Sequence, residues 1–220
     1  MELQLKKTRD GSYTLYRPDL DEHYHSIYGA VQESQYIYIN NGLQLISKPV
    51  IRIFDLGFGT GLNAILSLID SDKSGKALIY DSIEKYPLNT GYIRKLNYTD
   101  FLPENYHDIF YKIHDYQWNV SEIAGSMKLT KISGDIRDYV FTGKYDLIYF
   151  DAFSPEKEPD LWSADIFRKI FHALDQGGLL VTYSVKGKIR RILADIGFTI
   201  QKIQGPPGKK QILKASKYLI

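Results

Sequence analysis

Four acidic residues stand where short apolar segments end, and their carboxylates are the first candidates for chemistry. They are Asp55, Glu84, Asp135 and Asp151, at the ends of segments 50–55, 77–83, 128–132 and 145–150. Short apolar runs of this kind are typical of buried strands. The carboxyl ends of parallel strands meet at one edge of a sheet, where α/β proteins bind their ligands. We therefore expect the four carboxylates to share one site and to accept hydrogen bonds there from hydroxyl or amino groups.

The first acid opens a glycine-rich loop with the sequence DLGFGTGLN, residues 55–63. Its three glycines allow a tight turn and the close approach of a ligand just before a helix begins. A dinucleotide fingerprint requires its third glycine at position 62, where this chain has Leu62, which argues against a nicotinamide dehydrogenase. The spacing instead resembles the motif of class I S-adenosylmethionine-dependent methyltransferases, and a purely structural turn is the alternative. The cofactor ligands expected in this loop are Asp55, Gly57, Gly59, Gly61 and Asn63.

The second and third acids suit the two ends of an adenosine group. Glu84 can accept hydrogen bonds from both ribose hydroxyls through its two carboxylate oxygens, and its neighbour Lys85 joins the expected cofactor-binding set. Glu84 follows Gly57 by 27 residues, more than the usual ~20, and the polar segment SDKSGK, interpreted as a loop, accounts for the difference. Asp135 is expected to accept from the adenine amino group, and it also suits the cap of a helix that begins near residue 136. The alternative for Glu84 is a surface glutamate at a strand end.

The fourth acid, Asp151, begins the segment DAFSPEKEPDLW, residues 151–162. Its place at the end of the fourth strand faces the position that a transferred methyl group must occupy. A carboxylate there can accept a hydrogen bond from an attacking amine, orient the nitrogen lone pair and balance the developing charge. Phe153 and Trp162 are expected to pack on a flat substrate ring, and Pro155 belongs to the same substrate-binding segment. The alternative is that Asp151 caps a loop.

The order of the apolar segments predicts the fold that positions these residues. Strands are expected at 50–55, 77–83, 128–132, 145–150, 177–184, 198–203 and 211–217. Helices are expected at 61–69, 88–96, 107–116, 160–174 and 188–196. This alternation predicts an α/β fold, a doubly wound, mostly parallel seven-stranded sheet of the Rossmann-like type, in residues 49–220. Residues 1–48 are expected to add a β-hairpin around Asp10-Gly11 and a helix at about 29–39.

Composition excludes several classes of protein and of site. The chain has 220 residues, is 44% apolar, and has no cysteine, so disulfides, thiolate metal sites and cysteine nucleophiles are excluded. The sequence shows neither an apolar run of the ~18 residues that a membrane helix needs nor a signal peptide. His23 and His25 form only a weak metal-binding pattern, and neither a serine nucleophile elbow nor a Walker lysine is present. We expect a cytoplasmic protein without a metal cofactor.

The basic residues are concentrated at the C-terminal end. Residues 186–220 contain nine Lys or Arg and one acid, Asp195, whereas the first 185 residues have a net charge of −6. A basic end on an acidic body is typical of proteins that bind a polyanion such as nucleic acid. The alternative is a solvated basic surface without a partner.

Taken together, the motifs resemble one family, the methyltransferase domains of the bifunctional tRNA wobble-uridine enzymes called MnmC. The resemblance rests on DLGFGTGLN, SIEKYPL, the Gly-Asp pair at 134–135, DAFSPEKEPDLW, the strand at 177–183 and the turn GPPGKK. It extends upstream to YGAVQESQYIYINNGL and thus spans about residues 12–217. The segment KEPDLW departs slightly from the family pattern.

The resemblance implies a reaction, a cofactor and a partner. The family transfers a methyl group from S-adenosylmethionine, leaving S-adenosylhomocysteine, to the amine of 5-aminomethyl-2-thiouridine at tRNA position 34. It implies that Asp151 lies beside that amine and that Glu33 helps form the cofactor or substrate pocket. It also implies that basic residues grip the anticodon stem-loop, and the residues expected there are Lys186, Lys188, Arg190, Arg191, Lys209 and Lys210.

One departure from the family affects the expected substrate. Bifunctional relatives continue into an FAD-dependent oxidase domain, whereas this chain ends at Ile220, so we expect no FAD and a separate enzyme that supplies the aminomethyl intermediate. Methylation of another amine, on a small molecule or a protein, is the nearest alternative. A non-catalytic RNA-binding module is a second, although the presence of Glu84 and Asp151 argues against it.

Overall fold

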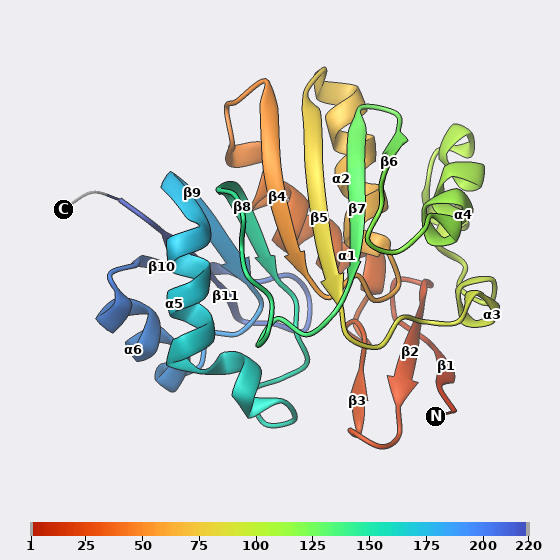
Figure 1. Cartoon of the computed structure of the whole chain (residues 1–220). Coiled ribbons are helices and arrows are strands. Elements are labelled where there is room, and N and C mark those ends of the chain that lie inside the picture. The colour runs from red at the N-terminus through yellow and green to blue at the C-terminus, as the bar shows by residue number, and fades with distance from the viewer. Residues whose placement is uncertain (1, 219–220) are drawn as a thin grey trace.

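The computed structural model describes residues 2–218, and within them the central element is an eight-stranded sheet. Its order is β10-β11-β9-β8-β4-β5-β7-β6 (Figure 1). The strands are β4 (Val50–Leu56), β5 (Ala77–Glu84), β6 (Ser121–Ala124), β7 (Met127–Ser133), β8 (Tyr145–Phe150), β9 (Leu174–Thr182), β10 (Thr199–Gln204) and β11 (Gln211–Ser216). Strands β9, β8, β4, β5 and β7 are parallel, while β6, β11 and β10 pair antiparallel at the edges. The expected doubly wound α/β fold is confirmed.

The chain winds outward from the middle of the sheet in two directions. From β4 it proceeds to β5 and then β7, and it later returns to β8 beside β4 and proceeds to β9. The order therefore reverses between β4 and β8, which is where sheets of this type bind their ligands. The first five strands expected from sequence form this parallel core. The sheet has one strand more than the seven predicted. The missed strand is β6, which is short and half polar and pairs with β7 after a tight turn, so it lacks the apolar pattern of the others.

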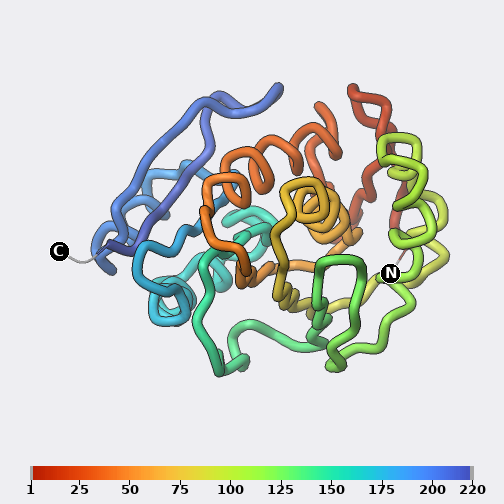
Figure 2. The backbone as a smooth tube through the Cα atoms, turned by 90° about the horizontal axis from the view of Figure 1, so that it is seen from above, coloured from red at the N-terminus to blue at the C-terminus, as the bar shows by residue number. Residues whose placement is uncertain are grey.

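Helices cover both faces of the sheet, and the residues of its central strands alternate between two cores. In β4, Ile51 and Ile53 pack on one side, whereas Phe54 and Leu56 pack on the other. The first core is covered by α1 (Ala30–Ser34), α2 (Leu62–Ser74) and α4 (His107–Asp115), and the second by α5 (Ala164–Ala173) and α6 (Gly187–Ile196). Figure 2, seen along the strands, shows helical turns on both sides of the sheet. Burial on both faces explains why these strands are almost continuously apolar.

Several helix ends differ from the sequence expectation. The segment SDKSGK is not a loop, because α2 continues through it to Ser74 and stops at Gly75, whose φ of 69° provides a left-handed C-terminal cap. Helix α5 begins at Ala164 instead of residue 160, after a 3-10 turn (Pro159–Trp162), because Ser163 is its N-cap. Helix α3 (Thr90–Ile93) is a single turn.

The N-terminal residues form a small second sheet at the carboxyl edge of the large one. The expected hairpin is present as β1 (Gln4–Lys7) and β2 (Tyr13–Arg17), and β3 (Glu22–His23) extends it. Figure 1 shows this sheet beside the ends of β4, β5 and β7. His25 fixes the contact, since its Nε2 lies 2.8 Å from Thr60 Oγ1 in the glycine loop, and burial lowers the pKa of His25 to about 4. No helix within residues 2–218 is long and apolar enough to cross a membrane.

Candidate active site

A cavity of about 590 Å³ opens at the carboxyl ends of β4, β5, β7 and β8. The loops after these strands line one side of it, and residues 22–28 of the N-terminal extension line another. Its volume lies within the range of about 300–1,000 Å³ that is usual for small-molecule sites. The cavity contains ten of the site residues expected from sequence: Glu33, Gly57, Gly59, Asn63, Glu84, Lys85, Asp135, Asp151, Phe153 and Lys209.

Two glycines of the loop after β4 form part of the cavity wall with their backbone. Gly57 has φ 105° and Gly59 has φ 48°, a region that favours glycine. A Cβ on Gly57 would lie 3.1 Å from the carbonyl oxygen of Asp151. Gly61 has a different task, because a Cβ there would lie 2.7 Å from the ring of His114, and the residue does not line the cavity. Gly57 and Gly61 therefore allow close packing against Asp151 and His114, and Gly57 and Gly59 contribute backbone to the cavity wall.

Glu84, the last residue of β5, is held in the cavity by two backbone donors. The N–H of Gly59 donates to Oε2 at 3.0 Å and the N–H of Tyr86 donates to Oε1 at 2.8 Å. Burial raises the pKa of Glu84, and these hydrogen bonds oppose that rise. Each oxygen keeps one free lone pair, so the carboxylate has a fixed orientation and can still accept two more hydrogen bonds.

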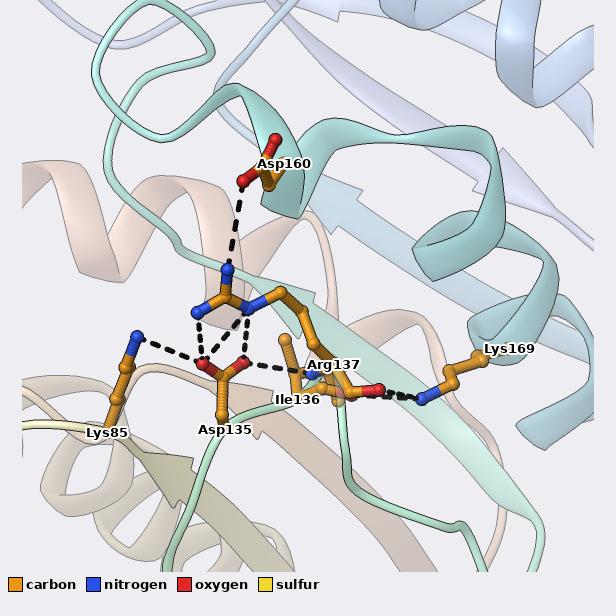
Figure 3. Close-up of polar contacts among 6 residues, drawn as sticks. All are labelled: Lys85, Asp135, Ile136, Arg137, Asp160 and Lys169. Carbon is orange, nitrogen blue, oxygen red and sulfur yellow. Dashed lines mark hydrogen bonds and ion pairs between the residues drawn. The ribbon is translucent and has the colours of Figure 1, made fainter.

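Asp135 lies in a charged network that Figure 3 shows. The Arg137 guanidinium donates to both carboxylate oxygens, with Nε at 3.0 Å from each, and Lys85 Nζ lies 3.1 Å from Oδ2. The guanidinium also lies 3.7 Å from Asp160. Hydrogen bonding to Arg137 holds the pKa of Asp135 well below its usual range. The helix expected to start near Ile136 is absent, because Asp135 instead closes a local turn by accepting from the Arg137 N–H at 2.9 Å.

Asp151, directly after β8, is anchored through both oxygens of its carboxylate. The Tyr38 hydroxyl donates to Oδ1 at 2.6 Å, and Asn63 Nδ2 donates to Oδ2 at 2.8 Å. Burial raises the pKa of Asp151, while these hydrogen bonds and the charge of Lys209 lower it. Tyr38 comes from a π-helical segment (Gln35–Asn40), a rare geometry that is common at functional sites. The result is a half-buried acceptor with one fixed orientation at the reversal point of the sheet.

Asp55, the remaining strand-end acid, lies beneath the cavity and does not line it. It is 1% exposed, and its Oδ2 accepts from Tyr80 at 2.9 Å and from Ser82 at 3.1 Å. Burial, followed by the charge of Asp151, raises its pKa well above the usual range. Asp55 therefore supports the neighbouring strands and has no free path to a ligand in this structure.

The segment after Asp151 contributes one of its three expected residues to the cavity. Phe153 lines it and packs edge-on against Tyr24, with ring centroids 5.1 Å apart. Pro155 lies outside the lining. Trp162 is 2% exposed, packs against Phe150, and donates from Nε1 to the Phe153 carbonyl at 2.8 Å. The expectation that Trp162 stacks on substrate is wrong for this structure, because the indole belongs to the core.

The expected basic residues divide into one inside the cavity and several outside it. Lys209 lines the cavity, where its Nζ lies 3.1 Å from Glu33 Oε1. The basic residues that do not line it are Lys186, Lys188, Arg190, Arg191 and Lys210. All of these except Arg190 are exposed, and Lys186 forms an ion pair with Glu156.

Sequence reasoning missed the cavity residues that come from other parts of the chain. Arg17, Tyr24 and Tyr183 line the cavity, and Tyr38 lies behind it against Asp151. Arg17 is 6% exposed and its guanidinium lies 5.3 Å from the ring centroid of Phe153. The N-terminal alternation indicated a hairpin but contained no signal for where that hairpin packs.

A parallel sheet whose strand order reverses beside an acidic, glycine-walled cavity is typical of α/β proteins that bind a nucleotide-type cofactor. A family model described as "S-adenosyl-L-methionine-dependent methyltransferase" matches residues 97–218, more than half of the chain. The chain belongs to this family of S-adenosylmethionine-dependent methyltransferases.

Individual relatives agree with this membership. The tRNA 5-methylaminomethyl-2-thiouridine biosynthesis bifunctional protein MnmC of Burkholderia multivorans is 29% identical over 91% of this chain. An uncharacterized protein of Methanocaldococcus jannaschii, MJ0670, is 30% identical over 97% of it. The chain spans 33% of the length of the first relative and 59% of the second.

Solved structures show the same architecture. The crystal structure of MNMC2 from Aquifex aeolicus matches with a TM-score of 0.82 and 28% identity, covering 100% of this chain and 72% of that one. Spermidine synthase from Thermotoga maritima matches with a TM-score of 0.58 and 13% identity, covering 100% of this chain and 73% of that one. The second likeness concerns the fold alone.

Proposed function

We propose that this methyltransferase methylates the primary amine of 5-aminomethyl-2-thiouridine at the wobble position of tRNA. The observation that carries the proposal is Asp151, a cavity carboxylate fixed by Tyr38 and Asn63 at the reversal point of the sheet. The likeness to MnmC proteins over 91% of the chain supports this substrate.

The residues around the cavity fit S-adenosylmethionine. Glu84 has two unused lone pairs for the ribose hydroxyls, and Gly57 and Gly59 line the cavity beside it. Asp135, held by Arg137, suits the adenine amino group. When bound, the cofactor supplies an electrophilic methyl group on a positively charged sulfur. Asp55 supports this wall from below without contacting the ligand.

Asp151 would orient the substrate amine and receive its proton. A neutral amine can donate one N–H to the carboxylate, which directs the nitrogen lone pair toward the methyl carbon. The bound cofactor would supply the methyl group for the new nitrogen–carbon bond and would keep the electron pair of the carbon–sulfur bond that is given up. The nitrogen then carries a positive charge and releases one proton, which an oxygen of Asp151 accepts. Phe153 offers an aromatic surface beside this position for a flat ring.

Nucleoside mass spectrometry tests the proposal directly. We expect tRNA carrying 5-aminomethyl-2-thiouridine to gain one methyl group at the wobble uridine when it is incubated with the protein and S-adenosylmethionine. The same tRNA without the aminomethyl group is the control and should gain none. Binding of S-adenosylhomocysteine without any methylation of this tRNA would contradict the proposed substrate and direct the search to other amines.

The exposed basic residues near the cavity would hold the phosphates of the anticodon stem-loop. Helix α6 starts after the carboxyl end of β9, and the turn between β10 and β11 lies at the same edge, since its Gly208 and Lys209 line the cavity. RNA recognition of this kind places an unstacked base in a pocket and leaves the phosphates outside. Lys188 and Lys210 are exposed at this edge and available for such contacts.

Charge reversal at this edge is expected to weaken tRNA binding in a salt-dependent way. In the double variant Lys188→Glu and Lys210→Glu, the slope of log Kd against log salt should fall by about one for each lost phosphate contact. Lys73→Glu, at the opposite end of the sheet, makes the same kind of charge change and should leave the slope unaltered. Filter binding of a stem-loop across salt concentrations measures both. An equal slope in the wild type and the double variant would exclude these residues from the RNA interface.

A further inference from the structure

Lys209 occupies a different environment from its neighbour Lys210. Lys210 is exposed, whereas Lys209 turns into the cavity, 3.1 Å from Glu33 Oε1 and 4.8 Å from the ring centroid of Tyr183. The preceding Gly208 has φ 85°, and a Cβ there would lie 2.1 Å from the Tyr28 ring. Tight packing of this turn on the N-terminal extension therefore aims Lys209 inward. A lysine in this position is poorly placed to hold an RNA phosphate outside the cavity.

The charges around the acceptor side of the cavity are mainly negative. Asp151 lies at the end of β8, Glu33 on α1, Asp55 under the floor on β4, and Glu84 on β5. The titratable groups that face them are the hydroxyls of Tyr24, Tyr38, Tyr80 and Tyr183 and the imidazole of His25. Most other cations of the lining are engaged with acids away from Asp151: Arg17 with Asp19, Lys157 with Asp21, and Lys85 and Arg137 with Asp135. Lys209 is the cation whose charge acts on Asp151.

An amine that binds in this negatively charged part of the cavity has to lose its proton before it can react. A protonated amine has no lone pair and cannot attack a methyl group, and clustered carboxylates favour the protonated form. A fixed cation nearby opposes that effect and also favours the ionised form of Asp151. The ion pair with Glu33 in turn moderates the influence of Lys209.

We propose that Lys209 and Glu33 act together as positioning residues that set the charge beside Asp151, so that the substrate amine is held there in its neutral form. This inference rests on the proposed function. It assigns Lys209 to the reaction site and leaves the outer lysines to the RNA. Removing the charge of Lys209 and removing the charge of Glu33 are predicted to shift the pH dependence of the reaction in opposite directions. Loss of a merely structural ion pair would give the same effect from either side.

The pH dependence of kcat, measured at steady state with saturating tRNA and S-adenosylmethionine, tests the proposal. Loss of the cation in Lys209→Gln should stabilise the protonated amine and move the acid limb of the profile to higher pH by about one unit. Glu33→Gln leaves Lys209 unopposed and should move the limb to lower pH. Lys209→Arg keeps the charge and should restore most of the wild-type profile. Lys73→Gln, the same change of charge at an exposed position on the opposite end of the sheet, should not move the limb.

The outcomes separate this inference from the proposed function. Binding of S-adenosylhomocysteine, measured by calorimetry, shows that each variant is folded. Opposite shifts in Lys209→Gln and Glu33→Gln support the proposal. An unmoved acid limb in both variants, with a salt-dependent rise in the KM for tRNA in Lys209→Gln, would overturn it and make Lys209 a phosphate contact. If the wild-type protein methylates no aminomethyl-tRNA, the proposed function itself fails.

Discussion

Replacing Asp151 by alanine is expected to lower kcat for methyl transfer by about 100-fold, within the range for a positioned acid–base group. The variant removes the acceptor that orients the amine and receives its proton. Glu84 and the glycine wall are untouched, so the affinity for S-adenosylhomocysteine should remain within a few-fold of the wild type. Steady-state rates with saturating tRNA, together with calorimetry of S-adenosylhomocysteine binding, measure the two effects separately.

Tyr38→Phe is the matched control for this prediction. It deletes the hydroxyl that donates to Asp151 at 2.6 Å and keeps the ring that packs in the core. The carboxylate remains with its second donor, Asn63, so kcat should fall by less than in Asp151→Ala. A rate for Asp151→Ala equal to the wild-type rate would remove Asp151 from the chemistry. An equal loss of kcat in Asp151→Ala and Tyr38→Phe would show that the carboxylate contributes to the reaction only when Tyr38 anchors it.

The parts of the site that could be predicted from sequence are those fixed by strand ends. A short apolar run followed by an acid locates a residue at the carboxyl edge of a parallel sheet, and this placed Glu84, Asp135 and Asp151 around one cavity. The spacing of glycines located the wall at Gly57 and Gly59 for the same reason. For these residues, the place at the end of an apolar strand determines both the position of the residue and the side of the sheet to which it is exposed.

Residues whose direction depends on distant contacts could not be predicted in this way. Asp55 stands at a strand end like the others, but its carboxylate lies under the floor, where it accepts from Tyr80 and Ser82 of the neighbouring strand. The contact between Tyr38 and Asp151 joins residues 113 positions apart. Lys209 and Lys210 are neighbours of one type, and only the packing of Gly208 on Tyr28 separates an inward side chain from an outward one. Nothing in the local sequence encodes these choices.

Both ends of the chain contribute to the cavity. The N-terminal extension packs where it forms part of the cavity wall. Glu22 accepts three hydrogen bonds from the N–H and hydroxyl of Ser154, at 3.0 to 3.1 Å, and so fixes the loop that begins at Asp151. Glu33 from the same extension meets Lys209 from the C-terminal hairpin. The strands supply the carboxylates, and the two ends of the chain close the cavity around them.

Trp162→Ala is expected to destabilise the protein by about 3–5 kcal/mol, the usual range for truncating a buried aromatic side chain. The indole is 2% exposed and contacts Phe150, Phe167 and Tyr183 in the core that α5 covers. Trp162→Phe keeps most of the apolar volume but loses the Nε1 donor to Phe153, so its cost should be clearly smaller. Urea unfolding followed by circular dichroism measures the free energy of unfolding for both variants.

The two aromatic residues of the segment after Asp151 should therefore show opposite patterns. Phe153 lines the cavity, so Phe153→Leu should raise the KM for tRNA with a small change in stability. Trp162→Phe should change stability and leave the KM close to that of the wild type, because the indole does not reach the cavity. If Trp162→Phe instead raised the KM at unchanged stability, the indole would have to leave the core when substrate binds. Trp162 would then meet the substrate ring, as the sequence predicts for both Phe153 and Trp162.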